Sequence, residues 1–268
     1  MTRLGWPLLL LLVLAGCDAA AGGCEDCDAG VDRPGDGGGA TDGGGATDGG
    51  APDASAPDGG VDGGLDAGTD AGPSLPLGCQ LSGVRLGARY RFRTVTDTST
   101  SESTSEITEW TQTGDSVSYT SESTGSNRGD GYEQTYTSIG HTRCDETGSY
   151  AISSETSGTT RRDGASTPFS TRTTYRPEFR TMVAELSVGQ TWTSRQAGST
   201  VSAGMTTSFD NSWRYRVARE GRRTVGAGTF DAFEIEVTQV GGMGAWSFWF
   251  APGVGTIETG PSELVELR

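Results

Sequence analysis

Lysine is absent from the 268-residue sequence, and histidine occurs once, at His141. Catalysis by a lysine side chain, including the Ser-x-x-Lys arrangement, is therefore excluded. A general base that titrates near neutral pH would have to be His141, and no Gly-x-Ser-x-Gly nucleophile motif accompanies it. Glu234 and Glu236 alternate with apolar residues, which is typical of the solvated face of a strand. We therefore expect a protein that is not an enzyme, with an unrecognised hydrolase as the alternative.

Basic residues are also scarce, and the formal net charge is −15. Residues 18–76 contain thirteen acidic residues and one Arg, whereas residues 77–268 are nearly balanced. Nucleic acid is not an expected partner, because binding a phosphate backbone requires a net basic face. We expect no cofactor and no metal ion either. Cys24 and Cys27 lack the two further ligands of a zinc site, and the Asp-Gly-Gly repeats lack the apolar position of stacked calcium-binding turns.

One long apolar run is present, Leu8–Leu14, and it is too short for a transmembrane helix of about 20 residues. With Arg3 before it, the run is typical of an export signal. The residues Leu14-Ala15-Gly16-Cys17 closely resemble the lipobox of bacterial lipoproteins. The resemblance implies a signal peptide over residues 1–17, lipidation of Cys17, and a lipid anchor in the inner or outer membrane of a bacterial cell envelope. An ordinary secretory signal with a chance cysteine is the alternative.

Residues 18–76 consist mainly of Asp, Gly and Ala. They cannot bury enough apolar surface to offset the entropy of ordering, so we predict a disordered tether. A flexible chain of this length has an end-to-end distance on the order of 40–45 Å. The composition changes near Pro76, which predicts a folded domain over residues 77–268.

Four cysteines remain if Cys17 carries lipid, and they allow three pairings. Cys24 and Cys27 are expected to form a local disulfide or to stay inert thiols. Cys79 lies at the start of the domain and Cys144 within it, and an oxidising envelope compartment favours their pairing. Such a disulfide would fasten the first residues of the domain to its sheet.

The domain shows the period-two alternation of half-buried strands, beginning at Arg89–Arg93. Trp110–Tyr119 predicts two strands around the turn Gly114-Asp115, and similar runs continue to the C-terminus. We predict an all-β fold of about 10–12 strands in a single antiparallel, strongly curved sheet or open barrel. Only Glu178–Leu186 has a spacing that would fit one or two helical turns.

Three segments of the C-terminal third occur in a characteristic order: Leu186–Trp192, then Ala227-Gly228-Thr229-Phe230, then Trp249-Phe250-Ala251-Pro252-Gly253-Val254-Gly255. The series resembles a group of exported bacterial β-proteins of unknown function, many of them lipoproteins. The resemblance implies an open, strongly curved antiparallel sheet, and it attaches no catalytic residue to these motifs.

Trp246, Phe248 and Phe250 alternate along one strand and therefore share a face of the sheet. They either line a concave site for an apolar or lipidic small molecule, or they fill the core. In the second case the domain is a structural module, or one that contacts another envelope protein at the membrane surface. We expect non-enzymatic binding of an apolar ligand near Trp246.

Overall fold

The computed structural model describes residues 74–268, which form one short helix, α1 (Leu77–Leu81), followed by twelve strands. The strands are β1 (Arg89–Val95), β2 (Ser99–Thr113), β3 (Ser116–Gly129), β4 (Tyr132–Asp145), β5 (Gly148–Arg162), β6 (Ala165–Val183), β7 (Thr191–Ser202), β8 (Met205–Val225), β9 (Gly228–Gln239), β10 (Ala245–Ala251), β11 (Gly255–Thr259) and β12 (Ser262–Leu267). The predicted signal peptide, Cys17, Cys24, Cys27 and nearly all of the predicted tether lie outside the described residues.

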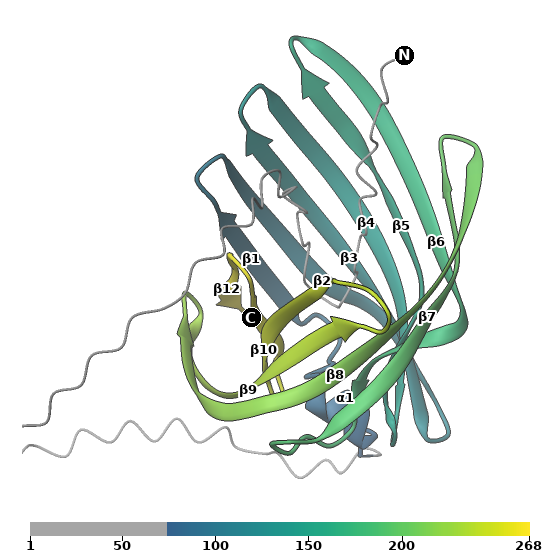
Figure 1. Cartoon of the computed structure of the whole chain (residues 1–268), viewed down its shortest axis with the longest axis vertical. Coiled ribbons are helices and arrows are strands. Elements are labelled where there is room, and N and C mark those ends of the chain that lie inside the picture. Colours follow the sequence, from purple (N-terminus) through teal and green to yellow (C-terminus); the bar gives the residue numbers. More distant parts are fainter. Residues whose placement is uncertain (1–73) are drawn as a thin grey trace, which may run out of the picture. The chain divides into compact units, whose positions relative to one another are not determined.

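Each strand pairs antiparallel with the next one in the chain, and β12 pairs with β1 to close a twelve-stranded barrel (Figure 1). The prediction of an all-β, antiparallel sheet is confirmed, and the sheet is closed rather than open. Closure depends on the register from Tyr90 opposite Leu267 to Thr94 opposite Ser262. A closed sheet has no edge strand, although β6 pairs with β7 only from Thr171 to Tyr175.

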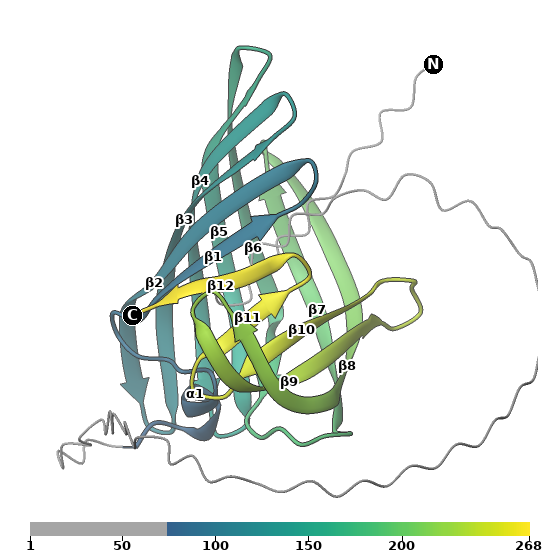
Figure 2. The same cartoon turned by 90° about the vertical axis from the view of Figure 1, so that its left-hand side faces the viewer.

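The wall of the barrel has two very different heights. Strands β2–β8 have between 12 and 21 residues, whereas β10–β12 have between 5 and 7. The long strands therefore rise well above the short ones, as Figures 1 and 2 show. We call the end with the turns Asp130-Gly131, Asp163-Gly164 and Ala203-Gly204 the upper rim. Asp163, Gly164, Ala203 and Gly204 all have positive φ, which is typical of the tight hairpin turns that match strand twist.

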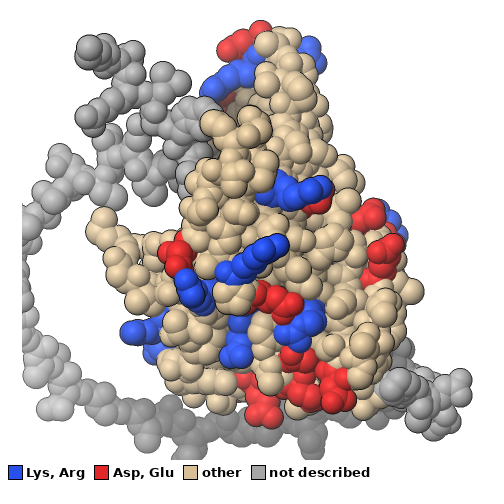
Figure 3. All heavy atoms as spheres, turned by 90° about the vertical axis from the view of Figure 1, so that its right-hand side faces the viewer, with Lys and Arg blue, Asp and Glu red and all other residues tan. Residues whose placement is uncertain are grey.

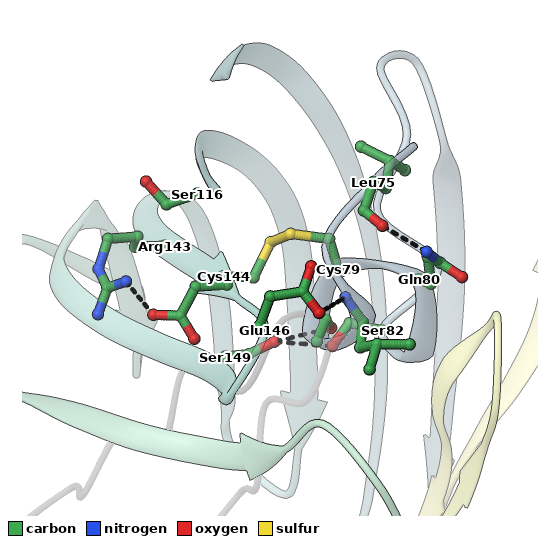
Figure 4. The surroundings of a disulfide bond; sticks show 12 residues. Leu75, Cys79, Gln80, Ser82, Ser116, Arg143, Cys144, Glu146 and Ser149 are labelled. Carbon is green, nitrogen blue, oxygen red and sulfur yellow. Dashed lines mark hydrogen bonds and ion pairs between the residues drawn. A yellow bond between two sulfur atoms is a disulfide. The ribbon is translucent and has the colours of Figure 1, made fainter. Parts of the chain in front are cut away.

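Helix α1 covers the lower end of the barrel, where it lies against β4 and β5 (Figure 2). A disulfide joins Cys79 of α1 to Cys144 of β4 across 65 residues of chain, and both cysteines are fully buried (Figure 4). Gly78 lies so close to the turn between β4 and β5 that a Cβ atom would collide with the carbonyl oxygens of Asp145 and Gly148. The pairing favoured by the sequence is thus the one in the structure, and it fastens α1 to the sheet.

The largest core cluster lies between strands β6 and β10 and includes Phe179, Trp192, Tyr215, Ile235 and Phe248. The expected helical turns over Glu178–Leu186 are wrong, because β6 continues to Val183. The side chains of Phe179 and Met182 point into this cluster as parts of a bulged strand.

A second cluster includes Phe92, Trp249, Ile257 and Leu264. The β8–β9 hairpin folds toward β12, and the amide of Ala227 donates to the carbonyl of Leu264 at 3.0 Å. A third cluster packs Cys79, Val84, Ile107, Val117 and Cys144 beneath α1. The first and third clusters pack inside the lower part of the barrel, whereas Trp249 of the second cluster lies on the opposite face of β10 from Phe248 and Phe250.

The outer face of the sheet carries ion pairs between arginines and acidic residues, and Figure 3 shows such side chains as neighbouring blue and red spheres. The pairs on adjacent strands include Arg91–Glu102 at 3.0 Å, Arg172–Glu155 at 2.8 Å and Arg216–Glu236 at 2.7 Å. Exposed pairs contribute about 0–1 kcal/mol each, so they fix strand register more than stability. Within residues 74–268, no helix is long and apolar enough to cross a membrane.

Candidate functional site

The three aromatic residues expected to form a ligand face belong mainly to the core. Phe248 and Phe250 retain 1% and 3% of their exposure, and both pack in the largest cluster. Trp246 is partly exposed at the edge of that cluster, where its ring meets Trp213 edge-on with the centroids 4.8 Å apart. The sheet therefore presents no open apolar face at this strand, because side chains of β6–β9 cover Phe248 and Phe250.

His141 lies on the other face of the sheet, away from the core. Its Nδ1 is 3.3 Å from the hydroxyl of Thr120 on the neighbouring strand. Among the described residues, no carboxylate or thiol is hydrogen-bonded to the imidazole. No group of three or more His, Cys, Asp or Glu side chains in residues 74–268 is arranged to hold a metal ion. The barrel interior is therefore the remaining candidate for a functional site.

The inner face of β2–β7 carries hydroxyl side chains in rows that run across the strands. The first hydroxyl row takes one residue from each of these six strands: Ser105, Ser123, Ser138, Thr156, Thr171 and Ser202. Adjacent strands lie about 4.8 Å apart, so neighbouring hydroxyls can bond directly. The Oγ of Ser138 and the Oγ1 of Thr156 are 2.9 Å apart.

A second hydroxyl row lies two residues nearer the lower end and consists of Ser121, Ser154, Thr173, Thr200 and Thr207. The Oγ1 atoms of Thr173 and Thr200 are 3.1 Å apart. Near the upper rim a further polar row contains Ser101, Asn127, Gln134, Thr160 and Thr167. In this described part of the sheet, none of the three rows contains a charged residue.

Between the upper polar row and the first hydroxyl row, two aromatic residues lie opposite glycines of the preceding strands. Tyr136 is opposite Gly125, and Phe169 is opposite Gly158. A Cβ atom at Gly125 would collide with the Tyr136 ring. A Cβ atom at Gly158 would collide first with the backbone carbonyl oxygen of Thr135 on β4, and it would lie 3.0 Å from Cε1 of Phe169. Because Gly has no side chain, each ring can rest against the backbone of the preceding strand.

The β7–β8 hairpin repeats this arrangement, with Phe209 opposite Gly198. A Cβ atom at Gly198 would lie 3.1 Å from Cζ of Phe209. The ring of Phe209 also meets Tyr175 edge-on at 5.9 Å. We call Tyr136 and Phe169, which share one row across the strands, the aromatic row, and the aromatic row together with the three polar rows the inner wall. Phe209 lies lower, in one row with Tyr175 and Gly198, below the second hydroxyl row. All three rings are partly exposed.

Amide side chains lie below Phe209 on β7–β9. Nε1 of Trp213 donates to Oε1 of Gln196 at 2.9 Å, and Nε2 of Gln239 donates to Oδ1 of Asn211 at 3.3 Å. Tyr175 is hydrogen-bonded to Gln196, but burial still raises the pKa of its phenol. This part of the interior is therefore polar and uncharged, like the inner wall.

Three buried polar atoms one or two pleats lower have no hydrogen-bond partner in the described part of the chain: Nε1 of Trp192, Oγ of Ser194 and the hydroxyl of Tyr215. The rings of Trp192 and Tyr215 stack with their centroids 4.9 Å apart. Burial also raises the pKa of Tyr215. A buried polar group without a partner costs about 1–3 kcal/mol, so these three atoms lower the stability of the core in which they lie.

A cavity of about 50 Å³ lies at the base of the wall, between the sheet and α1. Its lining includes the hydroxyls of Ser105, Ser121, Tyr90 and Tyr119 and the apolar side chain of Phe250. Burial raises the pKa of both tyrosines, so the cavity stays neutral at physiological pH. A water needs about 10–15 Å³ of such volume, so the cavity has room for a few waters and not for an acyl chain.

Sequence reasoning missed the inner wall, although a periodic signal for it exists. In each of three hairpins a glycine precedes an aromatic residue by eleven positions, with an x-Gly turn midway between them: Gly125 and Tyr136, Gly158 and Phe169, Gly198 and Phe209. That spacing places the two residues opposite each other on the same face. The hydroxyl rows could not be found in the same way, because they depend on the register of six strands.

Comparisons with known proteins add little to this geometry. The chain matches no protein-family model and no curated protein. Among solved structures, it is similar to a protein from Parabacteroides distasonis that is provisionally described as a lipoprotein, with 10% identity over 72% of this chain and 97% of that one. The TM-score is 0.25, and a likeness of this size carries no argument about the fold or the function of this chain.

Proposed function

We propose that this protein is a lipid-anchored protein of a bacterial cell envelope whose barrel binds a ligand along its inner wall without catalysing a reaction. The anchor is supported by the lipobox-like residues Leu14-Ala15-Gly16-Cys17. Each buried methylene of an acyl chain adds about 0.8 kcal/mol, so two or three chains on Cys17 hold a protein stably at a membrane.

The observation that carries the binding proposal is the inner wall itself. Its polar rows and aromatic row form a continuous uncharged surface, whereas the outer face of the same strands carries the ion pairs. Aromatic rings that pack against glycines and stay partly exposed can serve as contact surfaces. Ligand sites typically combine such apolar surfaces with a few oriented polar groups.

The expected apolar ligand near Trp246 is less well supported than a polar one. Phe248 and Phe250 are packed in the core, and the cavity at the base of the wall is too small for a lipid. Hydrocarbon against the hydroxyl rows would also leave buried hydroxyls without partners, at a cost of about 1–3 kcal/mol each. The packed core does favour a second candidate function, a structural or protein-interaction module that binds no small molecule.

Metabolic labelling with an alkyne fatty acid tests the anchor. Wild-type protein should be labelled and should fractionate with membranes, and Cys17→Ala should lose both properties. Equal labelling of the two proteins would overturn the assignment of Cys17.

Native mass spectrometry of full-length protein purified from its own membranes tests the binding proposal. The wild type should carry a non-covalently bound molecule, and the variant Tyr136→Ala/Phe169→Ala should lose it. Thr137→Val, an exposed position on the outer face of β4, serves as the matched control and should retain it. A wild-type protein without bound mass, or equal occupancy in all three proteins, would leave the structural module as the better account.

A further inference from the structure

We infer that the ligand of the inner wall is a neutral carbohydrate chain, an inference that rests on the proposed function and specifies its ligand class. The argument combines the chemistry of the hydroxyl rows, the orientation of the aromatic row, and the absence of charge from these rows of the described sheet.

The hydroxyl rows match a ligand that is itself polyhydroxylated. A Ser or Thr hydroxyl donates one hydrogen bond and accepts two. Bonds within the rows, such as Ser138 to Thr156 at 2.9 Å and Thr173 to Thr200 at 3.1 Å, use only part of that capacity. In the upper polar row, Oδ1 of Asn127 is buried and has no partner among the described residues. A sugar hydroxyl supplies the donor that this oxygen needs, and it accepts bonds from the neighbouring hydroxyls.

The aromatic row matches the apolar faces of sugar rings. The rings of Tyr136 and Phe169 lie against the glycines opposite them on the preceding strands and stay partly exposed on the inner face of the sheet. A pyranose has one face rich in C–H groups, and the electron-rich face of an aromatic ring attracts such groups. The two rings share one row with Gly158 between them, so they can contact two units of one chain.

Charge argues against the other occupants. The inner wall supplies no counter-ion, and transferring an unpaired charge out of water is strongly unfavourable. Residues 18–73 of this chain carry thirteen acidic side chains and are therefore unsuited to lie along the wall. Anionic lipid headgroups and acidic polysaccharides are disfavoured for the same reason. A neutral glycan has hydroxyls that can bond to the polar rows and C–H faces that can contact the aromatic row, and it carries no charge.

Isothermal titration calorimetry of the full-length protein in detergent tests the inference. The probes are three neutral oligosaccharides, maltoheptaose, cellohexaose and chitohexaose, with hexagalacturonic acid and oleic acid as comparators. At least one neutral probe should bind saturably and at least tenfold more tightly than either comparator. Phe169→Ala should weaken that binding at least tenfold, Phe169→Tyr should retain it, and Thr137→Val should have no effect.

The outcomes separate the two proposals. Oleic acid binding that Phe169→Ala weakens, without neutral oligosaccharide binding, would overturn the glycan and keep the inner wall as a site. The glycan assignment is also overturned if no neutral probe binds, or if binding is unchanged in Phe169→Ala with an unaltered thermal transition. The proposal that the wall binds a ligand is then decided separately by the native mass measurement.

Discussion

The disulfide between Cys79 and Cys144 should contribute strongly to the free energy of unfolding of the barrel. The perturbation is the double variant Cys79→Ala/Cys144→Ala, which avoids leaving a buried hydroxyl or a single reactive thiol. The bridge closes a loop of 65 residues, for which the loss of unfolded-state entropy amounts to about 4 kcal/mol at 25 °C. Both sulfur atoms belong to fully buried residues, so lost packing adds to this figure.

Equilibrium unfolding in guanidinium chloride measures the effect. With an m value of about 4–6 kcal/mol/M for a barrel of this size, the midpoint should fall by about 1 M. The matched control is Cys24→Ala/Cys27→Ala, which removes two cysteines of the predicted tether, outside the described residues, and should leave the midpoint unchanged. A loss of less than about 1 kcal/mol in the first variant would refute the reasoning, as would an equal loss in the control.

Four further predictions concern the core, the aromatic row, a buried hydroxyl and acid stability. Phe248→Ala should lower the free energy of unfolding by about 3–5 kcal/mol by denaturant titration, as for other buried aromatic truncations; a loss under 1 kcal/mol would show that the ring is not core. Gly158→Ala should disturb the β4–β5 pairing and displace the Phe169 ring, because its Cβ atom would lie 2.1 Å from the carbonyl oxygen of Thr135 and 3.0 Å from Cε1 of Phe169; nuclear Overhauser contacts between that ring and β5 should disappear. Tyr215→Phe should leave the midpoint unchanged or raise it, since it removes a buried hydroxyl without a partner; a marked loss would reveal a hidden bond. Burial opposes ionisation of Asp145, but hydrogen bonds from Thr147 and Arg143 still lower its pKa. Its contribution to stability is thus present above its ordinary pKa, near 4, and is lost as pH falls through the depressed value, so Asp145→Asn should flatten the acid limb of a stability–pH curve.

Local alternation was sufficient to predict the strand class and several strands. Arg89–Arg93 lies within β1, where Phe92 is buried and the arginines point outward. Trp110–Tyr119 spans the predicted turn between β2 and β3. These segments could be predicted because one face is apolar or aromatic and the other is charged, which is the pattern that a half-buried strand requires.

Closure and the upper wall could not be predicted in the same way. β2 extends over fifteen residues that are mostly Ser, Thr and Glu, and a strand with two polar faces has no hydrophobic period. It is a strand because β1 and β3 supply partners for its backbone along most of its length. The pairing of β1 with β12 joins segments from opposite ends of the domain, and no local residue pattern encodes that contact.

The aromatic strand at Trp246–Phe250 illustrates the limit for the candidate site. The sequence showed that Phe248 and Phe250 share a face, and they do. Whether that face is open depends on which side chains pack against it. Here Tyr175 of β6 and Trp213 of β8 belong to the same core cluster. The same residues therefore support a pocket or a core until the packing is known.

The position of the disulfide also has a mechanical consequence. Cys79 is the sixth of the described residues, and its bond leads directly into β4, which is paired along its whole length with β3 and β5. Tension applied to the chain before Ser74 therefore passes through a covalent bond into the lower end of β4, one of the long strands of the wall. The force is shared by two long ladders of hydrogen bonds, and the segment between the two cysteines carries none of it. The barrel can thus be pulled from its N-terminal side without its strands being peeled away one at a time.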